Sequence, residues 1–449
     1  MNRLFGTDGV RGVANSELTP ELAFNLGKAG AYVLSRSEEQ PVVLIGKDTR
    51  ISGDMLEDAI SAGILAMGGN VIKVGVLPTP AIAYLVRHMK ATAGIVISAS
   101  HNPFEYNGIK FFNGEGFKLD DDIEDEIEDI ILSNIDVNSH ITGEKLGRCV
   151  KGEEDAALVY SEFLKKTIDV NLNGIKAVID CANGASYRVA EKVLTDLGAE
   201  VIAISNEPDG MNINDNCGST HPEGLQKRVI SEKADLGLAF DGDADRLIAV
   251  DEKGMIVDGD KMIYICAKML KETGELYDNK VTATVMSNLG FHKAIESIGC
   301  NVDVTQVGDR YVLESMLKTG CVIGGEQSGH IIFLNHSTTG DGILSALQLL
   351  KAVKTSGRKL SELADEVSIY PQVLKNAKIK NENKKKYMND PEIAQEIRRL
   401  EELMAGEGRV LIRPSGTEPL VRVMIEGKDV ETITRLAEGL AALLTKRMG

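Results

Sequence analysis

Short apolar runs alternate with helix-forming segments along most of the chain. In the N-terminal part, the runs at residues 42–46, 71–76 and 94–97 have the length of buried strands. Helices are expected to begin at Thr19, an N-cap followed by Pro20, and at Ser52. Strands that alternate with helices predict a mostly parallel sheet with helices on both faces.

The same alternation returns twice. Further strands are expected at residues 175–180, 200–205, 234–240, 280–288, 300–305 and 321–325. They predict three consecutive α/β domains with mixed or parallel sheets. The tail differs, with helices at 391–404 and 429–448 and strands at 408–413 and 421–426, which is typical of a smaller α+β domain. The Lys- and Asn-rich residues 375–386 are expected to form an exposed connector or hairpin.

The predicted fold class is therefore α/β, with three α/β domains followed by a smaller C-terminal α+β domain around a central cleft. A chain of 449 residues is too long for one core. The expected domains span residues 1–152, 153–255, 256–368 and 369–449.

Composition restricts the partners. The formal net charge of −17 argues against nucleic acid or an anionic membrane, but a local cluster of Arg and Lys can still bind a small anion. The six Cys show no Cys-x-x-Cys spacing, which favours a reducing compartment. No apolar stretch reaches transmembrane length, so we expect a cytoplasmic protein with a small-molecule substrate.

The apolar run 94–97 breaks into Ser98-Ala-Ser-His-Asn-Pro103. A small hydroxyl side chain at a strand end is well placed for chemistry, and Pro103 restricts the turn. For these residues alone, a polar turn without function is the preferred interpretation.

Asp241-Gly-Asp-Ala-Asp-Arg246 is the strongest chemical signal. It follows an apolar strand, and alternate carboxylates on an extended segment point to one side. Three like charges this close are costly unless a cation binds them, and oxygen ligands favour Mg²⁺. An acidic solvated turn is the weaker alternative.

Two further loops suit a phosphosugar. Arg413-Pro-Ser-Gly-Thr-Glu-Pro419, with Arg422, combines guanidinium, hydroxyl and backbone donors for an anion, while a capped turn is the alternative. Gly324-Gly-Glu-Gln-Ser-Gly-His330 offers groups for sugar hydroxyls, although a plain turn explains it nearly as well. Serine, metal, phosphate and polyol sites together indicate phosphoryl transfer onto or from a sugar.

Taken together, these stretches resemble the four-domain α-D-phosphohexomutases. The resemblance rests on Phe5-Gly-Thr-Asp-Gly-Val-Arg-Gly12, Ser98–Pro103, Asp241–Arg246, Gly325–His330 and Arg413–Pro419, which follow the family order over nearly the whole chain. The first and fourth stretches look most like bacterial members that act on glucosamine phosphates.

The resemblance implies a role for each of the four expected domains, in the order phosphoserine loop, metal binding, sugar recognition and phosphate-binding lid. It also implies roles for individual residues. Ser100 is expected to become a phosphoserine, and its oxygen to bind Mg²⁺ together with Asp241, Asp243 and Asp245. Close to the phosphoserine we expect Arg11, His101, Lys110 and Arg246. The substrate-binding residues are expected to be Glu326, Ser328, His330, Arg413, Ser415, Gly416, Thr417 and Arg422.

The implied reaction converts glucosamine 6-phosphate and glucosamine 1-phosphate into one another through a 1,6-bisphosphate, for the UDP-N-acetylglucosamine and cell-wall pathway. A sugar 1,6-bisphosphate is the expected activator, and a homodimer is implied by resemblance alone. Lys110 and His101 both remain candidates for proton transfer; a lysine buried among cations has a lowered pKa, which suits a base.

Three other interpretations remain open. A phosphoglucomutase or phosphomannomutase shares the architecture. An aspartyl-phosphate phosphatase uses an Asp-x-Asp nucleophile, which Asp243-Ala-Asp245 resembles. A sugar-phosphate sensor binds without turnover.

Overall fold

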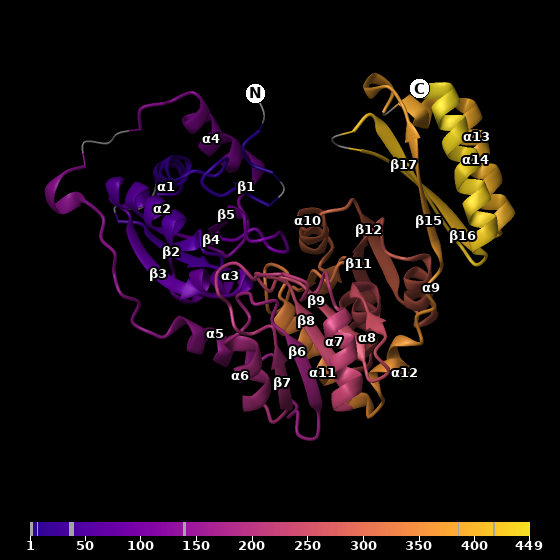
Figure 1. Cartoon of the computed structure of the whole chain (residues 1–449), viewed down its shortest axis with the longest axis horizontal. Coiled ribbons are helices and arrows are strands. Elements are labelled where there is room, and N and C mark those ends of the chain that lie inside the picture. The colour runs from indigo at the N-terminus through magenta and orange to yellow at the C-terminus, as the bar shows by residue number, and fades with distance from the viewer. Residues whose placement is uncertain (1–2, 7, 36–39, 138–140, 385, 416–417) are drawn as a thin grey trace. The chain divides into compact units, whose positions relative to one another are not determined.

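The computed structural model describes residues 3–6, 8–35, 40–137, 141–384, 386–415 and 418–449 (Figure 1). The chain divides into two compact units. The first comprises Met1–Met286 with Cys300–Asp365, and the second comprises Ser287–Gly299 with Glu366–Gly449. The chain is α/β, as predicted, with three mixed sheets in the first unit and a small antiparallel sheet in the second.

The first sheet has the order β1-β5-β4-β2-β3. Its strands are β1 (Val10–Val13), β2 (Val42–Lys47), β3 (Asn70–Val76), β4 (Ala93–Ile97) and β5 (Tyr106–Asn113). Strands β2, β3 and β4 run parallel, whereas β5 is antiparallel to β4 and to β1. The helices are α1 (Pro20–Leu34), α2 (Gly53–Ala66), α3 (Thr79–His88) and α4 (Asp121–Leu132), with a short helix η1 (Gly143–Lys145). Every residue of β4 is buried, as the apolar run predicts.

The expected helix start at Thr19 is confirmed. The Leu22 N–H donates to Thr19 Oγ1 at 3.2 Å, and Pro20 occupies the first helical position. A side chain that accepts from the first turn satisfies an otherwise unpaired donor. The local sequence therefore determines where α1 begins.

The second sheet has the order β10-β9-β8-β6-β7. Its strands are β6 (Lys176–Asp180), β7 (Glu200–Ile204), β8 (Leu236–Phe240), β9 (Leu247–Asp251) and β10 (Ile256–Val257), and its helices are α5 (Ala156–Lys165), α6 (Val189–Asp196) and α7 (Glu223–Glu232). Strands β6, β7 and β8 are parallel, and β9 returns antiparallel to β8. The acidic segment lies in the turn between β8 and β9.

The third sheet has the order β12-β11-β13-β14. Its strands are β11 (Lys280–Thr284), β12 (Asn301–Thr305), β13 (Ile323–Gly325) and β14 (Ile331–Phe333). The accompanying helices are α8 (Gly259–Glu272), η2 (Tyr277–Asn279), α10 (Asp309–Thr319), α11 (Gly342–Ser356) and α12 (Leu360–Ala364). The candidate sugar loop connects β13 to its antiparallel neighbour β14.

The second unit contains an antiparallel sheet of order β15-β17-β16. Its elements are α9 (Leu289–Ser297), β15 (Gln372–Lys378), η3 (Asn381–Asn383), η4 (Lys386–Asn389), α13 (Pro391–Met404), β16 (Gly408–Pro414), β17 (Leu420–Gly427) and α14 (Val430–Met448). The buried residues of β15, β17, α13 and α14 form the core of this unit.

The expectation of a connector at residues 375–386 is wrong in its first part. Residues 375–378 belong to β15, which pairs with β17 along its whole length. As an outer strand of the sheet, β15 tolerates Lys and Asn on its exposed face while Ala377 is fully buried. The polar composition of residues 375–378 therefore gave no indication that they form a strand.

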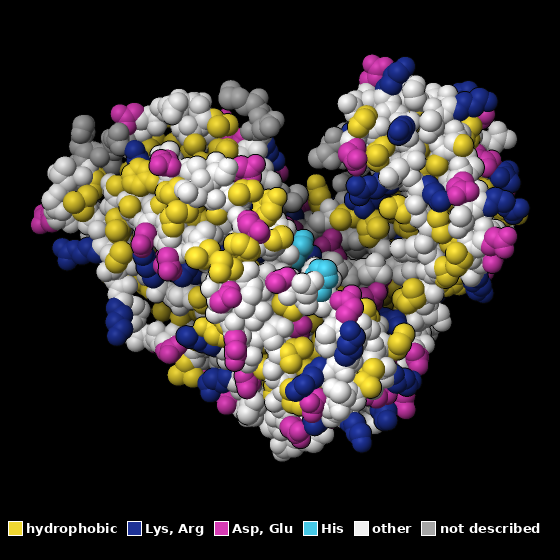
Figure 2. All heavy atoms as spheres, in the orientation of Figure 1, with side chains coloured by type: hydrophobic (Ala, Val, Ile, Leu, Met, Phe, Trp, Pro, Cys, Tyr) yellow, Lys and Arg dark blue, Asp and Glu magenta, His cyan; other side chains and the backbone are white. Residues whose placement is uncertain are grey.

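The surface is mixed in character. On the face drawn in Figure 2, Lys and Arg side chains are interspersed with Asp and Glu among the described residues. All six cysteines are free thiols, and five of them are buried. Within the described part of the chain, no helix combines the length and the apolar character that a membrane span requires.

Candidate active site

Ser100 lies in the turn that follows β4, the central strand of the first sheet. Its φ angle of 51° falls in the left-handed region, a backbone conformation that is energetically costly for residues other than glycine. The Ser100 N–H donates to Ser98 Oγ at 3.0 Å, and Ser98 Oγ donates to Asp48 at 2.5 Å. Ser100 is also only 1% exposed. The hydrogen bonds and the burial together hold the serine in one defined position.

Two buried side chains fasten this turn through its carbonyl groups. Arg50 donates to the carbonyl oxygens of Ser100 and Asn102, each at 2.9 Å, and to that of Pro103. Asn214, from the second α/β region, donates to the same carbonyls of Ser100 and Asn102 at 2.9 and 3.1 Å. Asp48 pairs with the Arg50 guanidinium at 2.8 Å. The turn is thereby held from both sides.

Sequence reasoning missed Arg50 and Asn214. The only signal for Arg50 was a charged loop directly after the buried strand 42–46. Asn214 gave no signal, because its contact depends on two segments that meet only in the folded chain.

The three carboxylates predicted to bind metal do converge. Asp241, Asp243 and Asp245 follow β8, and each is at most 5% exposed. Each offers one oxygen, and the three oxygens lie within 4.8 Å of one another. Burial raises the pKa of Asp241 well above its usual range, and repulsion from Asp245 and Asp243 raises it further. This repulsion is what a bound cation would relieve.

The donor set fits a hard divalent cation. Oδ1 of Asp243 and Oδ1 of Asp245 are buried, and neither has a hydrogen-bond partner among the described residues. Asp245 Oδ1 faces Arg246 Nε at 3.7 Å, which is beyond hydrogen-bond distance. Buried polar atoms are rarely left without hydrogen-bond partners, so both carboxylate oxygens are suited to bind a ligand. Carboxylate oxygens are the ligands that Mg²⁺ prefers.

Ser100 is joined directly to this cluster. Its Oγ donates to Asp241 Oδ2 at 2.6 Å. The backbone N–H of Arg246 donates to the other oxygen of Asp241 at 3.1 Å. The Ser100 hydroxyl therefore lies in direct contact with the carboxylate cluster.

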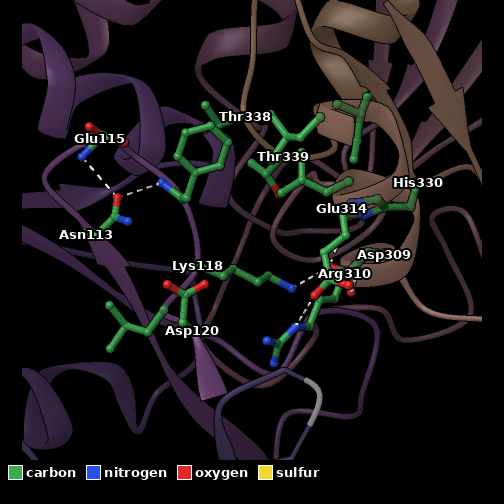
Figure 3. A pocket seen from close by; sticks show the side chains of 15 residues that line it. Asn113, Glu115, Lys118, Asp120, Asp309, Arg310, Glu314, His330, Thr338 and Thr339 are labelled. Atoms are coloured by element: carbon green, nitrogen blue, oxygen red, sulfur yellow. Dashed lines mark hydrogen bonds and ion pairs between the residues drawn. The ribbon is translucent and has the colours of Figure 1, made fainter. Parts of the chain in front are cut away.

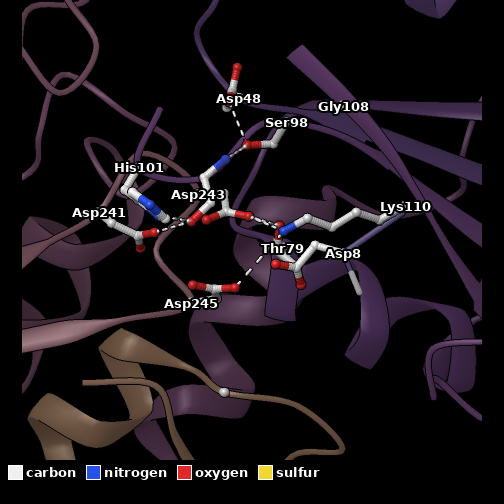
Figure 4. A network of polar contacts seen from close by, with 12 residues as sticks. Asp8, Asp48, Thr79, Ser98, His101, Gly108, Lys110, Asp241, Asp243 and Asp245 are labelled. Atoms are coloured by element: carbon white, nitrogen blue, oxygen red, sulfur yellow. Dashed lines mark hydrogen bonds and ion pairs between the residues drawn. The ribbon is translucent and has the colours of Figure 1, made fainter. Parts of the chain in front are cut away.

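Lys110, on β5, lies against the carboxylates rather than among cations (Figure 4). Its Nζ is 2.8 Å from Asp243 Oδ2 and 3.9 Å from Asp245 Oδ2. Burial acts to lower the pKa of Lys110, but Asp243, Asp245 and Asp8 outweigh it and raise that pKa above its ordinary value. The expectation of a lowered pKa is therefore wrong, because the neighbours of Lys110 are mainly acidic.

His101, Arg11 and Arg246 were also expected close to Ser100. His101 Nδ1 lies 3.4 Å from Ser100 Oγ. Burial lowers the pKa of His101, and the positive charges of Arg246 and Arg11 lower it further. The Nε atoms of Arg11 and Arg246 are buried without a hydrogen-bond partner among the described residues. Donors of this kind suit the oxygens of a phosphoryl group on Ser100.

The predicted sugar loop follows β13. Glu326 Oε1 accepts a hydrogen bond from the Gly308 N–H at 3.0 Å, and Ser328 is exposed. His330 is buried, with Nε2 accepting from the Gly340 N–H at 3.1 Å and Nδ1 3.6 Å from Asp245 Oδ2. His330 therefore connects the predicted sugar loop to the carboxylate cluster.

A cavity of about 400 Å³ adjoins the cluster at His330 (Figure 3). On one side it is lined by the segment after β5, and on the other by α10. Lys118 lies between these two sides, with Nζ 2.8 Å from Asp8 and in contact with Asp309. Neither Lys118 nor Asp309 was predicted from the sequence. The cavity is large enough for a small ligand, and the partly buried ion pairs of Lys118 lie at its wall.

The predicted phosphate loop lies in the second unit. Arg413 on β16 and Arg422 on β17 are direct cross-strand partners. Like charges opposite each other in a sheet repel, and an anion between them removes that cost. Ser415 Oγ accepts from the Glu418 N–H at 3.1 Å. Gly416 and Thr417 lie outside the described residues.

Comparison with known proteins gives four matching family models. They are described as α/β/α domains I, II and III and the C-terminal domain of phosphoglucomutase/phosphomannomutase, and they match residues 2–137, 159–254, 258–370 and 374–443.

Full-length relatives and solved structures agree. Proteins named phosphoglucosamine mutase are 57% identical in Alkaliphilus metalliredigens and 60% identical in Thermoanaerobacter sp., each over 100% of both chains. A putative phosphomannomutase from Thermus thermophilus has a TM-score of 0.77 at 26% identity, covering 98% of both chains. A phosphoglucomutase/phosphomannomutase family protein from Burkholderia thailandensis, 23% identical, shares the fold with a TM-score of 0.81, covering 99% of this chain and 97% of its own.

Proposed function

Because the chain belongs to the phosphoglucomutase/phosphomannomutase family, we propose that it is the mutase that interconverts glucosamine 6-phosphate and glucosamine 1-phosphate. The choice of sugar is supported by relatives named phosphoglucosamine mutase, at 57–60% identity over the full length. The product would feed the synthesis of UDP-N-acetylglucosamine and cell-wall precursors in the cytoplasm. We retain domain boundaries at 152/153, 255/256 and 368/369 and a homodimer as parts of this proposal.

The observation that carries the mechanism is the hydrogen bond of 2.6 Å from Ser100 Oγ to Asp241. It places a hydroxyl at the edge of a carboxylate cluster whose remaining oxygens suit a cation. The groups around Ser100 include both this carboxylate cluster and basic side chains. Among the described residues, no hydrogen bond or ion pair joins His101 to a carboxylate as in a hydrolytic Ser-His-Asp triad. The arrangement favours a serine that carries a phosphoryl group over one that attacks an ester.

In the first half-reaction, phosphorylated Ser100 donates its phosphoryl group to the free hydroxyl of the sugar phosphate. The bond between phosphorus and the Ser100 oxygen breaks, and a bond to the sugar oxygen forms. The 1,6-bisphosphate then turns over in the site. In the second half-reaction Ser100 takes back the other phosphoryl group, so the enzyme ends as it began. An enzyme that has lost its phosphoryl group is restored by a sugar 1,6-bisphosphate, which is the proposed activator.

Mg²⁺ held by Asp241, Asp243, Asp245 and an oxygen of Ser100 or its phosphate would withdraw charge from the transferring phosphoryl group. The chain's own cations share that task. Arg11 and Arg246 have buried donors to spare, and Lys110 stays charged beside Asp243. Fixed positive charge in a buried site stabilises the charge that develops in the transition state.

Proton transfer is assigned to His101 on the basis of position. Its ring nitrogen is the one at 3.4 Å from Ser100 Oγ, whereas the Lys110 ammonium is committed to Asp243. In each half-reaction the attacking hydroxyl loses one proton and the leaving oxygen gains one, so the two transfers balance. His101 would give the proton to the serine oxygen when the phosphoryl group leaves and accept the proton of Ser100 when Ser100 attacks, and the proton released by the sugar hydroxyl would replace the one that His101 gives.

Substrate recognition is divided among the remaining loops. Glu326 and Ser328 would contact hydroxyls of the sugar ring. His330, which lies 3.6 Å from Asp245, would take part in binding the substrate from that side of the loop. Arg413, Ser415, Gly416, Thr417 and Arg422 would bind the phosphate that is not being transferred. Hydroxyls near the middle of the ring keep nearly the same place when the bisphosphate turns over, so Glu326 and Ser328 could contact the sugar in both orientations.

Turnover of three substrates tests the choice of sugar. The purified enzyme, activated with the matching 1,6-bisphosphate, is assayed with glucosamine, glucose and mannose 1-phosphates. We expect the highest kcat/KM with glucosamine 1-phosphate. A higher value with glucose or mannose 1-phosphate would assign the chain to a phosphoglucomutase or phosphomannomutase instead.

A further inference from the structure

Thr79, the first residue of α3, makes two hydrogen bonds to a single carboxylate residue of the proposed metal site. Its N–H donates to the backbone carbonyl of Asp243 at 2.9 Å, and its Oγ1 donates to Asp243 Oδ2 at 2.6 Å. Both residues are 1% exposed. Figure 4 shows Thr79 beside Asp243, on the same side as Lys110. Backbone and side chain of Asp243 are therefore both fixed from the first sheet region.

The two oxygens of Asp243 have different surroundings. Oδ2 accepts from Thr79 Oγ1 and from Lys110 Nζ, at 2.6 and 2.8 Å. Oδ1 is buried and has no hydrogen-bond partner among the described residues. Two donors on one oxygen hold the carboxylate plane, so the other oxygen is the one left for a cation.

Thr79 is itself held rigidly. Pro78 precedes α3 and Pro80 lies within its first turn, and the helix buries Ile82, Leu85 and Val86 against the first sheet. Proline restricts the backbone at a helix start, and a packed apolar face prevents rotation of the helix. A hydroxyl on such a helix is a fixed reference point for a carboxylate on a turn.

The backbone of the turn that bears Asp243 is held by other segments: the Ala185 N–H donates to the Gly242 carbonyl at 2.8 Å and the Gly342 N–H donates to the Ala244 carbonyl at 2.9 Å. Ala244 has a φ of 57°, a conformation that is costly for alanine. A Cβ added at Gly242 would lie 2.5 Å from the Ser100 carbonyl oxygen, so the two active-site turns touch through their backbones. Contacts from outside the turn are needed to keep its carboxylates in place.

We propose that Thr79 is a positioning residue for the divalent-cation site, which orients Asp243 so that Oδ1 is presented to the ion. This inference rests on the proposed function, because it takes the carboxylate cluster to hold Mg²⁺. Metal-ligating carboxylates are themselves usually hydrogen-bonded, and loss of such a partner typically weakens metal affinity about 10- to 100-fold.

The test measures metal binding directly, with Mn²⁺ as the probe and electron paramagnetic resonance to count the free ion. Thr79→Val keeps the shape of the side chain and removes the hydroxyl, while Thr79→Ser keeps the hydroxyl. We expect Thr79→Val to bind Mn²⁺ about 10- to 100-fold more weakly than the unaltered protein, and Thr79→Ser to bind within a few-fold of it. Thr79→Ala tests the same hydroxyl without asking the site to accommodate two methyl groups.

A second readout separates positioning from general damage. In turnover assays, Thr79→Val should need more Mg²⁺ for half-maximal activity and approach the unaltered kcat at saturating Mg²⁺. Equal Mn²⁺ affinities for Thr79→Val, Thr79→Ala and the unaltered protein would overturn the inference. If the unaltered protein bound no Mn²⁺, or bound it equally after Asp243→Asn, the proposed metal site itself would be wrong.

Discussion

The hydroxyl of Ser100 donates a hydrogen bond of 2.6 Å to Asp241, although the two residues lie 141 positions apart in the chain. The bond joins the turn after β4 to the turn after β8, two strands of different sheets. Each turn follows the end of a fully buried strand. Polar groups at strand ends are a common way to build a site on an α/β scaffold.

Arg50→Lys should impair catalysis by loosening the Ser100 turn. Lysine keeps the positive charge, but its single nitrogen cannot replace a planar guanidinium that donates to the turn from two nitrogens and to Asp48 from the third. Ser100 is then no longer held at the position from which it transfers the phosphoryl group. Misplacement of a reacting group by about 1 Å can cost about 100-fold in rate, and a fall in kcat of that order is expected.

Steady-state kinetics measure the effect of Arg50→Lys. The matched control is Arg399→Lys on the exposed face of α13, which should leave kcat unchanged. If Arg50→Lys kept the full kcat, the three carbonyl contacts would not be what positions the serine.

Lys110→Met should reduce kcat about 100- to 1000-fold, because it removes a buried cation that stabilises the negative charge on the phosphoryl group in the transition state. The loss should persist when the assay pH is raised, since the role is electrostatic and the pKa of Lys110 is raised above its ordinary value. Normal turnover by Lys110→Met would exclude the residue from the reaction.

Arg422→Ala should raise KM for the sugar phosphate about 10- to 100-fold with a smaller change in kcat. A hydrogen bond to a charged group contributes about 1.5–3 kcal/mol, and the contact to the non-transferred phosphate is made in both the ground state and the transition state. Arg399→Ala, which removes a charge from α13, serves as the control. A fall in kcat with KM unchanged would contradict this assignment.

Asp341 should give the first unit a pH-dependent stability. It caps α11 by accepting from the Leu344 N–H at 2.9 Å, and it also accepts from Tyr160 Oη at 2.7 Å. Burial raises the pKa of Asp341 to about 6, so the folded state holds its proton more tightly than the unfolded state does. At pH 7 the folded protein therefore pays a penalty for holding Asp341 ionised. As the pH falls from about 6 towards about 4, Asp341 takes up its proton in the folded state and the free energy of unfolding rises by about 2–3 kcal/mol.

Thermal unfolding of the unaltered protein and of Asp341→Asn, at pH 7 and pH 5, measures this dependence. The difference in melting temperature, unaltered minus variant, should be larger at pH 5 than at pH 7. An unchanged difference would show that Asp341 titrates with an ordinary pKa.

The sequence predicted much of the fold and the centre of the site. Apolar runs identified β4 and β8, and the acidic residues directly after β8 predicted the carboxylate cluster. These features are local, because a strand end and the turn after it are adjacent in the chain. The cap at Thr19 is local in the same sense. Ser100 became a candidate only when its turn was considered together with the other motifs of the chain.

What could not be predicted depends on tertiary contacts. Thr79, Arg50 and Asn214 are ordinary residues in the sequence, and only the folded chain brings them to Asp243 and the Ser100 turn. The raised pKa of Lys110 likewise follows from which charges surround it, which residue order does not reveal. The first residues of the 375–386 segment were missed because an edge strand can be as polar as a loop.

The central claim is that Ser100, and not an aspartate, carries the phosphoryl group. Incubation of the intact enzyme with glucosamine 1,6-bisphosphate, followed by peptide mass spectrometry, locates the group. We expect phosphate on Ser100, and no labelling or turnover in Ser100→Ala. The mutase mechanism would be contradicted by phosphate on Asp243 or Asp245, or by full turnover in Ser100→Ala, and either result would favour an aspartyl-phosphate phosphatase. It would also be contradicted if the unaltered protein bound the sugar phosphate without labelling or turnover, which would favour a sensor.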